Sequence, residues 1–269
     1  MAQPIILVGA GNMGGALLKG WCEAGIGPIL AVEPAPSPGL AALAKTRHIA
    51  LFAHTASIDS IAARACVVAL KPQILKIAAA GLAPIAQSGA LMISIAAGAT
   101  TQGLRAAWGA ETRLIRAMPN TPGSIGRGIT ALFAAKGATG KDKTLADTLL
   151  SALGRTVWVK AERDIDAVTA VSGSGPAYIF LLVEALAAAA EAEGLPRQLA
   201  ETLARATVAG SGALLDADPA PAATLRRNVT SPGGTTQAAL DILLAKDGLA
   251  PLMRRAIAAA RKRAEELGS

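Results

Sequence analysis

The apolar positions of this chain follow two different patterns, one in each part of the sequence. Through about the first 160 residues, short apolar runs of strand length alternate with helical stretches. This alternation is typical of a parallel sheet with helices on both faces. The predicted strands lie near residues 4–9, 29–33, 49–52, 66–70, 90–95, 113–117, 128–134 and 156–159.

Beyond Arg163 the pattern changes to long helical runs that are rich in alanine and leucine. Turn residues interrupt these runs at 194–196, 216–221 and 231–234. We therefore predict an α/β protein of two domains. Residues 1–162 form a Rossmann-type doubly wound sheet that binds a dinucleotide, and residues 163–269 form an all-helical dimerisation and substrate-binding domain. Such apolar helices would expose too much apolar surface to water in an isolated monomer, which predicts a homodimer.

The first apolar run leads directly into a glycine-rich turn. A strand, then glycines, then a helix is the order that the dinucleotide fingerprint requires. Gly9 permits a tight turn, Gly11 lets the backbone approach a pyrophosphate, and Gly14 lets the helix pack against the strand. The turn predicts a nicotinamide dinucleotide, with a flavin, an S-adenosyl ligand or a purely structural turn as alternatives.

Glu33 ends the second apolar run, nineteen residues after Gly14. An acid at the tip of this strand accepts hydrogen bonds from the ribose hydroxyls of NAD and repels the 2′-phosphate of NADP. Glu33 therefore favours NADH over NADPH, unless a cation such as Lys45 or Arg47 intervenes.

The segment Ser231-Pro232-Gly233-Gly234-Thr235-Thr236 carries two glycines where we predict the start of a helix. Serine suits the N-cap and proline suits the first helical position. Each glycine in that first turn costs about 0.5–1 kcal/mol relative to alanine, so a ligand that approaches the backbone explains them better. Free N–H groups at a helix N-terminus bind anions, which predicts a carboxylate substrate here. The alternative is a loop that uses glycine only for turning.

Three further clusters follow predicted strands at their carboxyl ends, where such folds build their sites. They are Lys71-Pro72-Gln73, the segment 94–98 and Met118-Pro119-Asn120-Thr121-Pro122. Asn120 offers an amide that can bind a carboxamide, although an ordinary turn also explains it. A lysine at a strand end such as Lys71 can contact ribose or phosphate, or can simply be solvated.

Five motifs follow one another along almost the whole chain: the glycine turn at 9–14, Lys71-Pro72-Gln73, Met118–Pro122, Ser172–Tyr178, which opens a long helix of the second domain, and Ser231–Thr236. In this order they resemble the pyrroline-5-carboxylate reductase family. The resemblance implies reduction of the cyclic imine 1-pyrroline-5-carboxylate to L-proline by hydride transfer from NAD(P)H, the last step of proline biosynthesis. It also implies dimers that often assemble into larger rings.

The resemblance further implies roles for individual residues. The Thr236 hydroxyl would act at the ring nitrogen as the catalytic group. The substrate would be bound by Ser231, Gly233, Gly234, Thr235 and Thr236. The cofactor would be bound by Gly9, Gly11, Asn12, Met13, Gly14, Glu33, Ala69, Lys71, Pro72, Ala97 and Asn120. Glu33 departs from the nonacidic residue that family members often have near this point, which again favours NADH.

Two other functions fit parts of the sequence. A hydroxyacid or 6-phosphogluconate-type dehydrogenase shares the order of sheet and helices, but it needs a catalytic lysine in the helical domain. Lys160 and Lys246 are the only lysines between Arg155 and Met253, and neither lies in a glycine-rich turn. A non-catalytic dinucleotide-binding regulator would keep the first glycine turn but has no need of residues 231–236.

Composition narrows the remaining classes. The net charge is +7, but aromatic residues make up only 3%, and the positive charge is spread thinly, so we expect no nucleic-acid partner. The uncharged stretch 77–104 is broken by prolines, glycines and polar residues, so we expect no membrane span. Two cysteines in apolar contexts and a chain that begins without a charged leader predict a reducing cytoplasm. No cluster of metal ligands is apparent.

Overall fold

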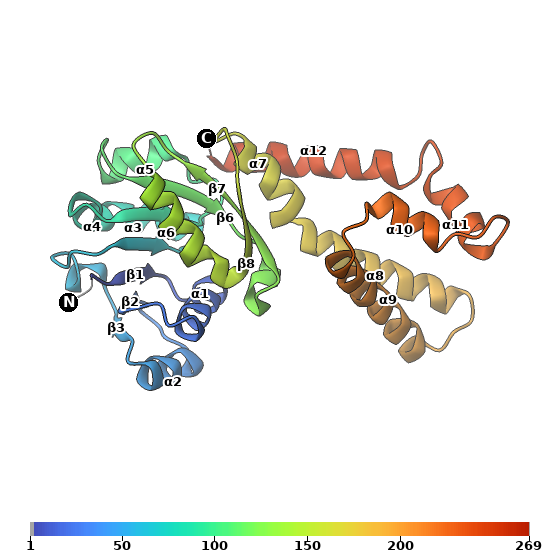
Figure 1. Cartoon of the computed structure of the whole chain (residues 1–269), viewed down its shortest axis with the longest axis horizontal. Coiled ribbons are helices and arrows are strands. Elements are labelled where there is room, and N and C mark those ends of the chain that lie inside the picture. The colour runs from blue at the N-terminus through green and yellow to red at the C-terminus, as the bar shows by residue number, and fades with distance from the viewer. Residues whose placement is uncertain (1–2, 269) are drawn as a thin grey trace. The chain divides into compact units, whose positions relative to one another are not determined.

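The structure is a computed structural model that describes residues 3–268, and the chain divides into two compact units (Figure 1). Among the described residues, the first unit comprises residues 3–173 together with 260–268, and the second comprises residues 174–259. The last helix of the chain therefore begins in the second unit and ends in the first.

The first unit is built on an eight-stranded sheet with the order β3-β2-β1-β4-β5-β6-β7-β8 (Figure 1). All eight predicted strands are present, with bounds within two residues of those expected. They are β1 (Ile5–Val8), β2 (Ile29–Val32), β3 (Ala50–Phe52), β4 (Ala65–Val68), β5 (Leu91–Ser94), β6 (Leu114–Met118), β7 (Gly128–Ala134) and β8 (Gly154–Trp158).

The alternation of elements predicted a parallel sheet, but the observed sheet contains one antiparallel pair. Strand β7 runs antiparallel to β6, whereas all other neighbouring pairs are parallel. Only residues 119–127 connect these two strands, and a parallel crossover needs about a dozen residues or more. The short, proline-containing connection therefore reverses the chain direction.

Helices cover both faces of the sheet. On one face, α1 (Asn12–Glu23), α2 (Pro38–Arg47) and α6 (Gly140–Leu150) bury their apolar sides against the strands, and on the other face α3 (Pro72–Ala78), α4 (Ala83–Gln87) and α5 (Thr101–Trp108) do so. Trp21 and Trp108 are fully buried, one in each layer. Short helices complete the unit: η1 (Thr55–Ser57), η2 (Ala79–Leu82), η3 (Thr121–Ile125), η4 (Ser151–Leu153), α7 (Asp164–Val168) and the π-helix η5 (Thr169–Gly173).

The second unit contains only helices and loops. Its helices are α8 (Gly175–Ala192), α9 (Arg197–Ala217), α10 (Ala222–Asn228), α11 (Thr235–Leu243) and the first half of α12 (Leu249–Gly268). Helices α8 and α9 pack side by side as a hairpin (Figure 1), and small residues such as Ala187 and Ala200 are buried there. Large apolar side chains remain exposed, among them Phe180 at 61% and Leu181 at 62%.

One helical stretch has the length and composition of a membrane span. It runs from Asp164 to Ala192, and almost none of its most apolar segment is buried within the chain. A helix that a second protein copy covers has the same composition. The sequence motif Ser172–Tyr178 lies inside this stretch.

Candidate active site

The order of the strands reverses its direction across the sheet at β1, which creates a switch point. From β1 the chain passes to β2 and β3 on one side, and it then returns to β4 on the other side of β1. In such sheets, ligands bind outside the carboxyl ends of the strands at this switch point. The Ala69 N–H donates to the Val8 carbonyl at 2.8 Å, and the Gly9 N–H donates to the Val32 carbonyl at 2.9 Å. The glycine turn and Ala69 therefore lie at the switch point.

The three glycines of the turn occupy positions with different steric demands. Gly9 has a φ of +88°, a conformation that favours glycine. A Cβ on Gly14 would lie 2.0 Å from the Gly9 carbonyl oxygen, so any side chain there would separate α1 from the turn. Around a Cβ on Gly11, no described heavy atom lies within 4 Å. This open space at the N-terminus of α1 fits a pyrophosphate.

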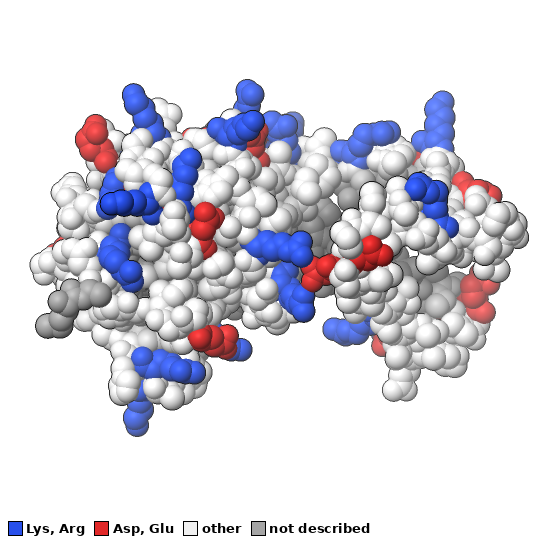
Figure 2. All heavy atoms as spheres, in the orientation of Figure 1, with Lys and Arg blue, Asp and Glu red and all other residues white. Residues whose placement is uncertain are grey.

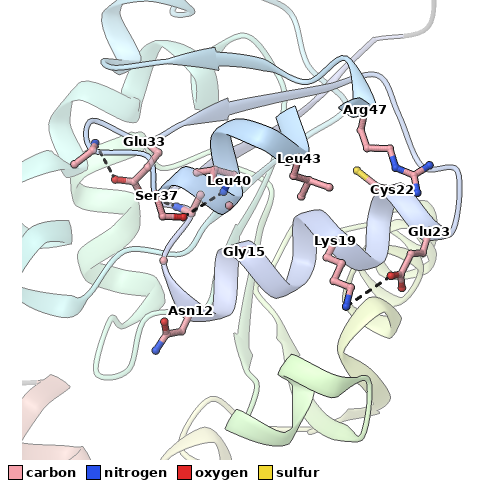
Figure 3. A pocket seen from close by; sticks show the side chains of 14 residues that line it. Asn12, Gly15, Lys19, Cys22, Glu23, Glu33, Ser37, Leu40, Leu43 and Arg47 are labelled. Carbon is pink, nitrogen blue, oxygen red and sulfur yellow. Dashed lines mark hydrogen bonds and ion pairs between the residues drawn. The ribbon is translucent and has the colours of Figure 1, made fainter. Parts of the chain in front are cut away.

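A cavity of about 700 Å³ begins at this turn and runs along α1 (Figure 3). Glu33, at the end of β2, faces the turn, and its carboxylate accepts a hydrogen bond from the Ala10 N–H at 2.8 Å. Ser37 lies at the same end of the cavity, and it caps α2 by accepting a hydrogen bond from the Leu40 N–H. The cavity, the glycines and Glu33 together fit the adenosine half of a dinucleotide.

The cation that sequence reasoning considered as a partner of the 2′-phosphate lies at the other end of this cavity. Figure 3 shows Arg47 beside Cys22, far from Glu33 and Asn12. Cys22 is ten residues further along α1 than Asn12, which corresponds to about 15 Å at 1.5 Å per residue. Lys45 does not line the described cavity. Arg47 therefore does not lie beside Glu33.

The predicted residues at the ends of β4, β5 and β6 meet different environments. Lys71 is exposed and precedes α3, which begins with Pro72. Ala97 packs against the apolar cluster that contains Met118. The Asn120 side-chain oxygen accepts a hydrogen bond from the Ile129 N–H at 3.0 Å, so it holds its own loop. The amide nitrogen of Asn120 is the part of this side chain that remains for a ligand.

An ion pair that sequence reasoning missed lies beneath these loops. Arg116, only 3% exposed, donates to the Glu162 carboxylate at 2.6 Å. Thr101 donates to the same carboxylate from its backbone N–H at 2.7 Å and from its hydroxyl at 2.5 Å. Burial by itself raises the pKa of Glu162, but the hydrogen bonds from Thr101 and Arg116 and the charge of Arg116 outweigh it and hold this pKa below its ordinary value.

The glycine-rich segment of the second unit differs from its prediction. Helix α11 begins at Thr235 with Gly234 as the N-cap, so the expectation of Ser231 as N-cap and Pro232 as the first helical residue is wrong. The Gly234 N–H donates to the Ser231 carbonyl at 3.0 Å, and Gly233 has a φ of +70°. These features are those of a type II turn, which favours proline followed by glycine at its centre.

The shift of the helix start leaves free N–H groups at the N-terminus of α11, where the anion site is predicted. The first backbone bond of α11 runs from the Ala238 N–H to the Gly234 carbonyl. The N–H groups of the preceding helical residues lie outside the helical ladder, at the positive end of the helix dipole. Thr235 is exposed and Thr236 is half-buried. The same short segment therefore carries both backbone N–H donors and two threonine hydroxyls.

Comparison with known proteins identifies the family through relatives that cover both units. Residues 162–267 match the family model for pyrroline-5-carboxylate reductase dimerisation, and residues 4–98 match that for NADP oxidoreductase, coenzyme F420-dependent. The chain is 38% identical over 270 residues to the pyrroline-5-carboxylate reductase of Pseudomonas aeruginosa, which covers 99% of this chain and 98% of that protein. The chain belongs to the pyrroline-5-carboxylate reductase family.

Solved structures of pyrroline-5-carboxylate reductases agree with this assignment. The enzyme from Coxiella burnetii superimposes with a TM-score of 0.91 at 35% identity, over 100% of both chains. The Plasmodium falciparum enzyme, whose structure has NADP bound, gives a TM-score of 0.83 at 28% identity and covers 99% of this chain and 98% of that chain. The chain is therefore an oxidoreductase that uses a nicotinamide dinucleotide, and the regulator and hydroxyacid dehydrogenase alternatives are set aside.

Proposed function

We propose that this chain reduces 1-pyrroline-5-carboxylate to L-proline with NAD(P)H, and that it prefers NADH. The observation that carries the proposal is similarity to the Pseudomonas aeruginosa reductase over 99% of the chain. That similarity spans both the glycine turn at the switch point and the loop before α11. The open backbone at Gly11 and the cavity beside it suit the cofactor.

The adenosine diphosphate half of the cofactor is held by the first unit. The N–H groups at the start of α1 bind the pyrophosphate, and the Glu33 carboxylate accepts hydrogen bonds from the ribose hydroxyls. Lys71, Ala97 and Asn120 line the path toward the nicotinamide, which supplies a hydride when the cofactor is bound. The full set of cofactor residues is Gly9, Gly11, Asn12, Met13, Gly14, Glu33, Ala69, Lys71, Pro72, Ala97 and Asn120.

The preference for NADH rests on the charge of Glu33. A carboxylate beside a 2′-phosphate raises the free energy of NADPH binding by about 1–3 kcal/mol unless a cation intervenes. Arg47, the cation of this cavity that the sequence suggested, lies at its far end beside Cys22. The end of the cavity that we assign to the ribose is lined by the acid Glu33, and the lining cation Arg47 lies at the other end, which supports this preference.

The loop before α11 binds the substrate carboxylate through backbone N–H groups and hydroxyls. Ser231, Gly233, Gly234 and Thr235 form this cradle, and the left-handed Gly233 turns the chain into it. The Thr236 hydroxyl hydrogen-bonds the ring nitrogen of the imine and orients the ring. A protonated imine accepts hydride readily, so orientation of the ring supplies most of the rate acceleration.

The enzyme works as a homodimer built through the helical unit. Apolar side chains on α8 and α9 are exposed in the single chain, and a second copy covers them. The apolar stretch Asp164–Ala192 lies within the residues that match the dimerisation family, so we assign it to this interface and not to a membrane. Larger rings form from these dimers.

Figure 2 shows lysine and arginine scattered and interspersed with acids on the visible face, without a stripe for nucleic acid.

We place the enzyme in the cytoplasm, because both of its cysteines are free thiols. Burial raises the pKa of the Cys66 thiol to about 12, so this side chain stays protonated in the core. Cys22 is half-buried in α1, where burial also raises its pKa. Neither cysteine forms a disulfide bond, so neither requires an oxidising compartment.

A direct assay tests the proposed function. The purified chain is mixed with NADH or NADPH and the cyclic imine, and the loss of reduced cofactor is followed together with the formation of proline. We expect turnover with the imine and none with hydroxyacids and oxidised cofactor. Turnover of a hydroxyacid in place of the imine would overturn the proposal.

A further inference from the structure

Glu162 connects three segments of the first unit through one carboxylate. One oxygen accepts hydrogen bonds from the Thr101 N–H at 2.7 Å and from Arg116 at 2.6 Å, and the other accepts the Thr101 hydroxyl at 2.5 Å. These partners are 61 and 46 residues away in the sequence. The carboxylate therefore ties together the N-terminus of α5, the middle of β6 and the segment that leads into α7.

Each tied segment borders a loop at the nicotinamide end of the cofactor site. Thr101 directly follows the loop of residues 95–100, which contains Ala97. Arg116 lies two residues before Met118, after which the chain enters the Asn120 loop. Ala97 and Val168 pack against the cluster that contains Met118, so the two loops and the segment after Glu162 share one apolar contact.

The charges of Glu162 and Arg116 make this connection strong. Arg116 is only 3% exposed, and without the Glu162 carboxylate its buried guanidinium would lose its ion-pair partner and keep only the nearby charge of Asp166. Hydrogen bonds to charged groups are stronger than those between neutral groups. Loss of the Glu162 charge therefore releases the start of α5 and Arg116 at the same time.

We infer that Glu162 is a positioning residue that sets the loops after β5 and β6 at the spacing that the nicotinamide half of the cofactor needs. The inference rests on the proposed function, which places the nicotinamide beside Ala97 and Asn120. Glu162 itself touches neither the substrate nor the cofactor in this assignment. Its effect reaches the cofactor through Thr101 and Arg116.

The test compares two ligands that share the adenosine diphosphate half. ADP-ribose contacts only the glycine turn and the Glu33 cavity, whereas NADH also reaches the loops after β5 and β6. In Glu162→Gln, we expect the Kd of NADH to rise about tenfold, the scale of one lost charged hydrogen bond, while the Kd of ADP-ribose stays within about twofold. Equal changes for both ligands, or no change for either, would overturn the inference.

Matched variants keep the test interpretable if Glu162→Gln folds poorly. Thr101→Val removes one hydrogen bond to the carboxylate and is expected to weaken NADH binding selectively, and Thr101→Ser is expected to restore it. Glu201→Gln serves as the control, because Glu201 forms only an exposed ion pair with Arg197. Failure of Thr101→Ser to recover NADH affinity would count against the inference.

Ala97→Leu separates failure of this inference from failure of the proposed function. This side chain would project into the loop assigned to the nicotinamide, so NADH affinity is expected to fall while ADP-ribose affinity is retained. If Ala97→Leu weakens NADH binding and Glu162→Gln does not, only the role of Glu162 is wrong. If neither variant affects NADH binding, the nicotinamide lies elsewhere and both assignments are wrong.

Discussion

The two units use similar aliphatic residues but bury them to very different extents. In the first unit, the strands β1, β4, β5 and β6 consist entirely of buried residues, and Ile5 and Leu7 are completely inaccessible. In the second unit, Phe180 and Leu181 are more than half exposed, and α11 contains no buried residue. The first unit completes its own core, whereas the helical unit, which matches the dimerisation family, leaves large apolar side chains uncovered in the single chain.

The same contrast separates the two ligand sites. The glycine turn after β1 is closely packed, since a Cβ on Gly14 would lie 2.0 Å from the Gly9 carbonyl oxygen and 3.3 Å from the Ala69 Cβ. In the loop before α11, a Cβ on Gly233 would meet no described atom, so this glycine is required only for its φ of +70°. The turn proposed for the cofactor is thus closely packed within one chain, whereas Gly233 in the loop proposed for the substrate has open space around it.

The largest effect is expected from Gly14→Val. A Cβ at Gly14 would lie 2.0 Å from the Gly9 carbonyl oxygen, so α1 must move away from the turn. We expect NADH binding to be lost, with a rise in Kd above about a hundredfold, as for a backbone site that a side chain fills. Titration of NADH fluorescence measures this. Gly140→Ala is the control, because no described atom lies within 4 Å of a Cβ there. Retained NADH affinity in Gly14→Val would show that the turn is not the cofactor site.

Leu181→Glu is expected to separate the subunits. A charge placed on an apolar face that a second copy covers has no partner there, and its desolvation opposes association. Light scattering after gel filtration is expected to show a monomer with little reductase activity, while ADP-ribose still binds to the first unit. Ile77→Glu is the matched control, because Ile77 is 83% exposed on α3 of the first unit and is expected to leave the dimer intact. A dimeric Leu181→Glu would place the interface elsewhere.

Thr236→Ala tests the substrate loop of the helical unit. Removal of a hydroxyl that contacts the ring nitrogen in the transition state is expected to lower kcat roughly ten- to a thousandfold. NADH affinity is expected to stay unchanged, and Thr236→Ser is expected to recover much of the rate. Thr202→Ala is the control, because that threonine is exposed and its hydroxyl bonds only to the helical carbonyl of Gln198. An unchanged kcat in Thr236→Ala would remove this residue from the mechanism.

Gly234→Val tests the same loop through the substrate. A side chain here would block the approach of the carboxylate to the N–H groups, and its Cβ would lie 3.1 Å from the Ser231 carbonyl oxygen. We expect the KM for the imine to rise and the affinity for NADH to be retained. Weakened NADH binding with an unchanged KM for the imine would show that the loop belongs to the cofactor site.

Glu33→Gln is expected to change the choice of cofactor by about tenfold, since one unit of charge beside a phosphate is worth about 1–3 kcal/mol. The ratio of kcat/KM for NADPH to that for NADH measures the effect and is expected to rise. Glutamine can still accept the hydrogen bond from the Ala10 N–H, so the turn is kept. Glu23→Gln, at the far end of the cavity beside Lys19, is expected to leave the ratio unchanged. A tenfold preference of the unmodified enzyme for NADPH would contradict the role given to Glu33.

Features that depend on neighbouring residues could be predicted from the sequence. The strands and the glycine turn are local patterns, and the structure confirms the strand positions. The start of α11 was predicted wrongly because serine followed by proline suits both a helix N-terminus and a type II turn. The left-handed φ of Gly233, which decides between them, is not visible in that pattern.

Features that depend on distant residues could not be predicted. Arg116 stands as a lone charge in an apolar strand, which signals a partner, but nothing in the sequence identifies Glu162 as that partner. Likewise, Arg47 follows Glu33 by only fourteen residues, yet α2 carries it to the other end of the cavity. In both cases the fold, and not the sequence distance, decides which charges meet.

The smallest expected effect is a change in thermal stability caused by Asp166. This residue lies near Glu162, but its contribution to stability changes with pH in the opposite direction. Burial raises the pKa of Asp166 above its ordinary value of 3.8; Arg116 and Arg261 oppose this rise, and Glu265 and Glu162 add to it. Its protonated form is favoured in the folded state, so its contribution to stability is present below pH 3.8 and is lost as the pH rises through the folded pKa. Asp166→Asn is therefore expected to raise Tm at pH 7 by less than about 2–4 °C, the shift that 1 kcal/mol gives in a protein of this size.

The gain in Asp166→Asn is expected to shrink as the pH approaches 3.8. Glu162 has a lowered pKa, so its contribution is present above its ordinary value of 4.5 and is lost as the pH falls through the folded pKa. Glu162→Gln is therefore expected to lower Tm at pH 7, with a deficit that shrinks toward acid. Thermal unfolding of the two variants between pH 3.5 and 7, about the range that spans both ordinary values, measures these opposite slopes. Parallel profiles would show that the two carboxylates do not lie in the different environments that the structure gives them.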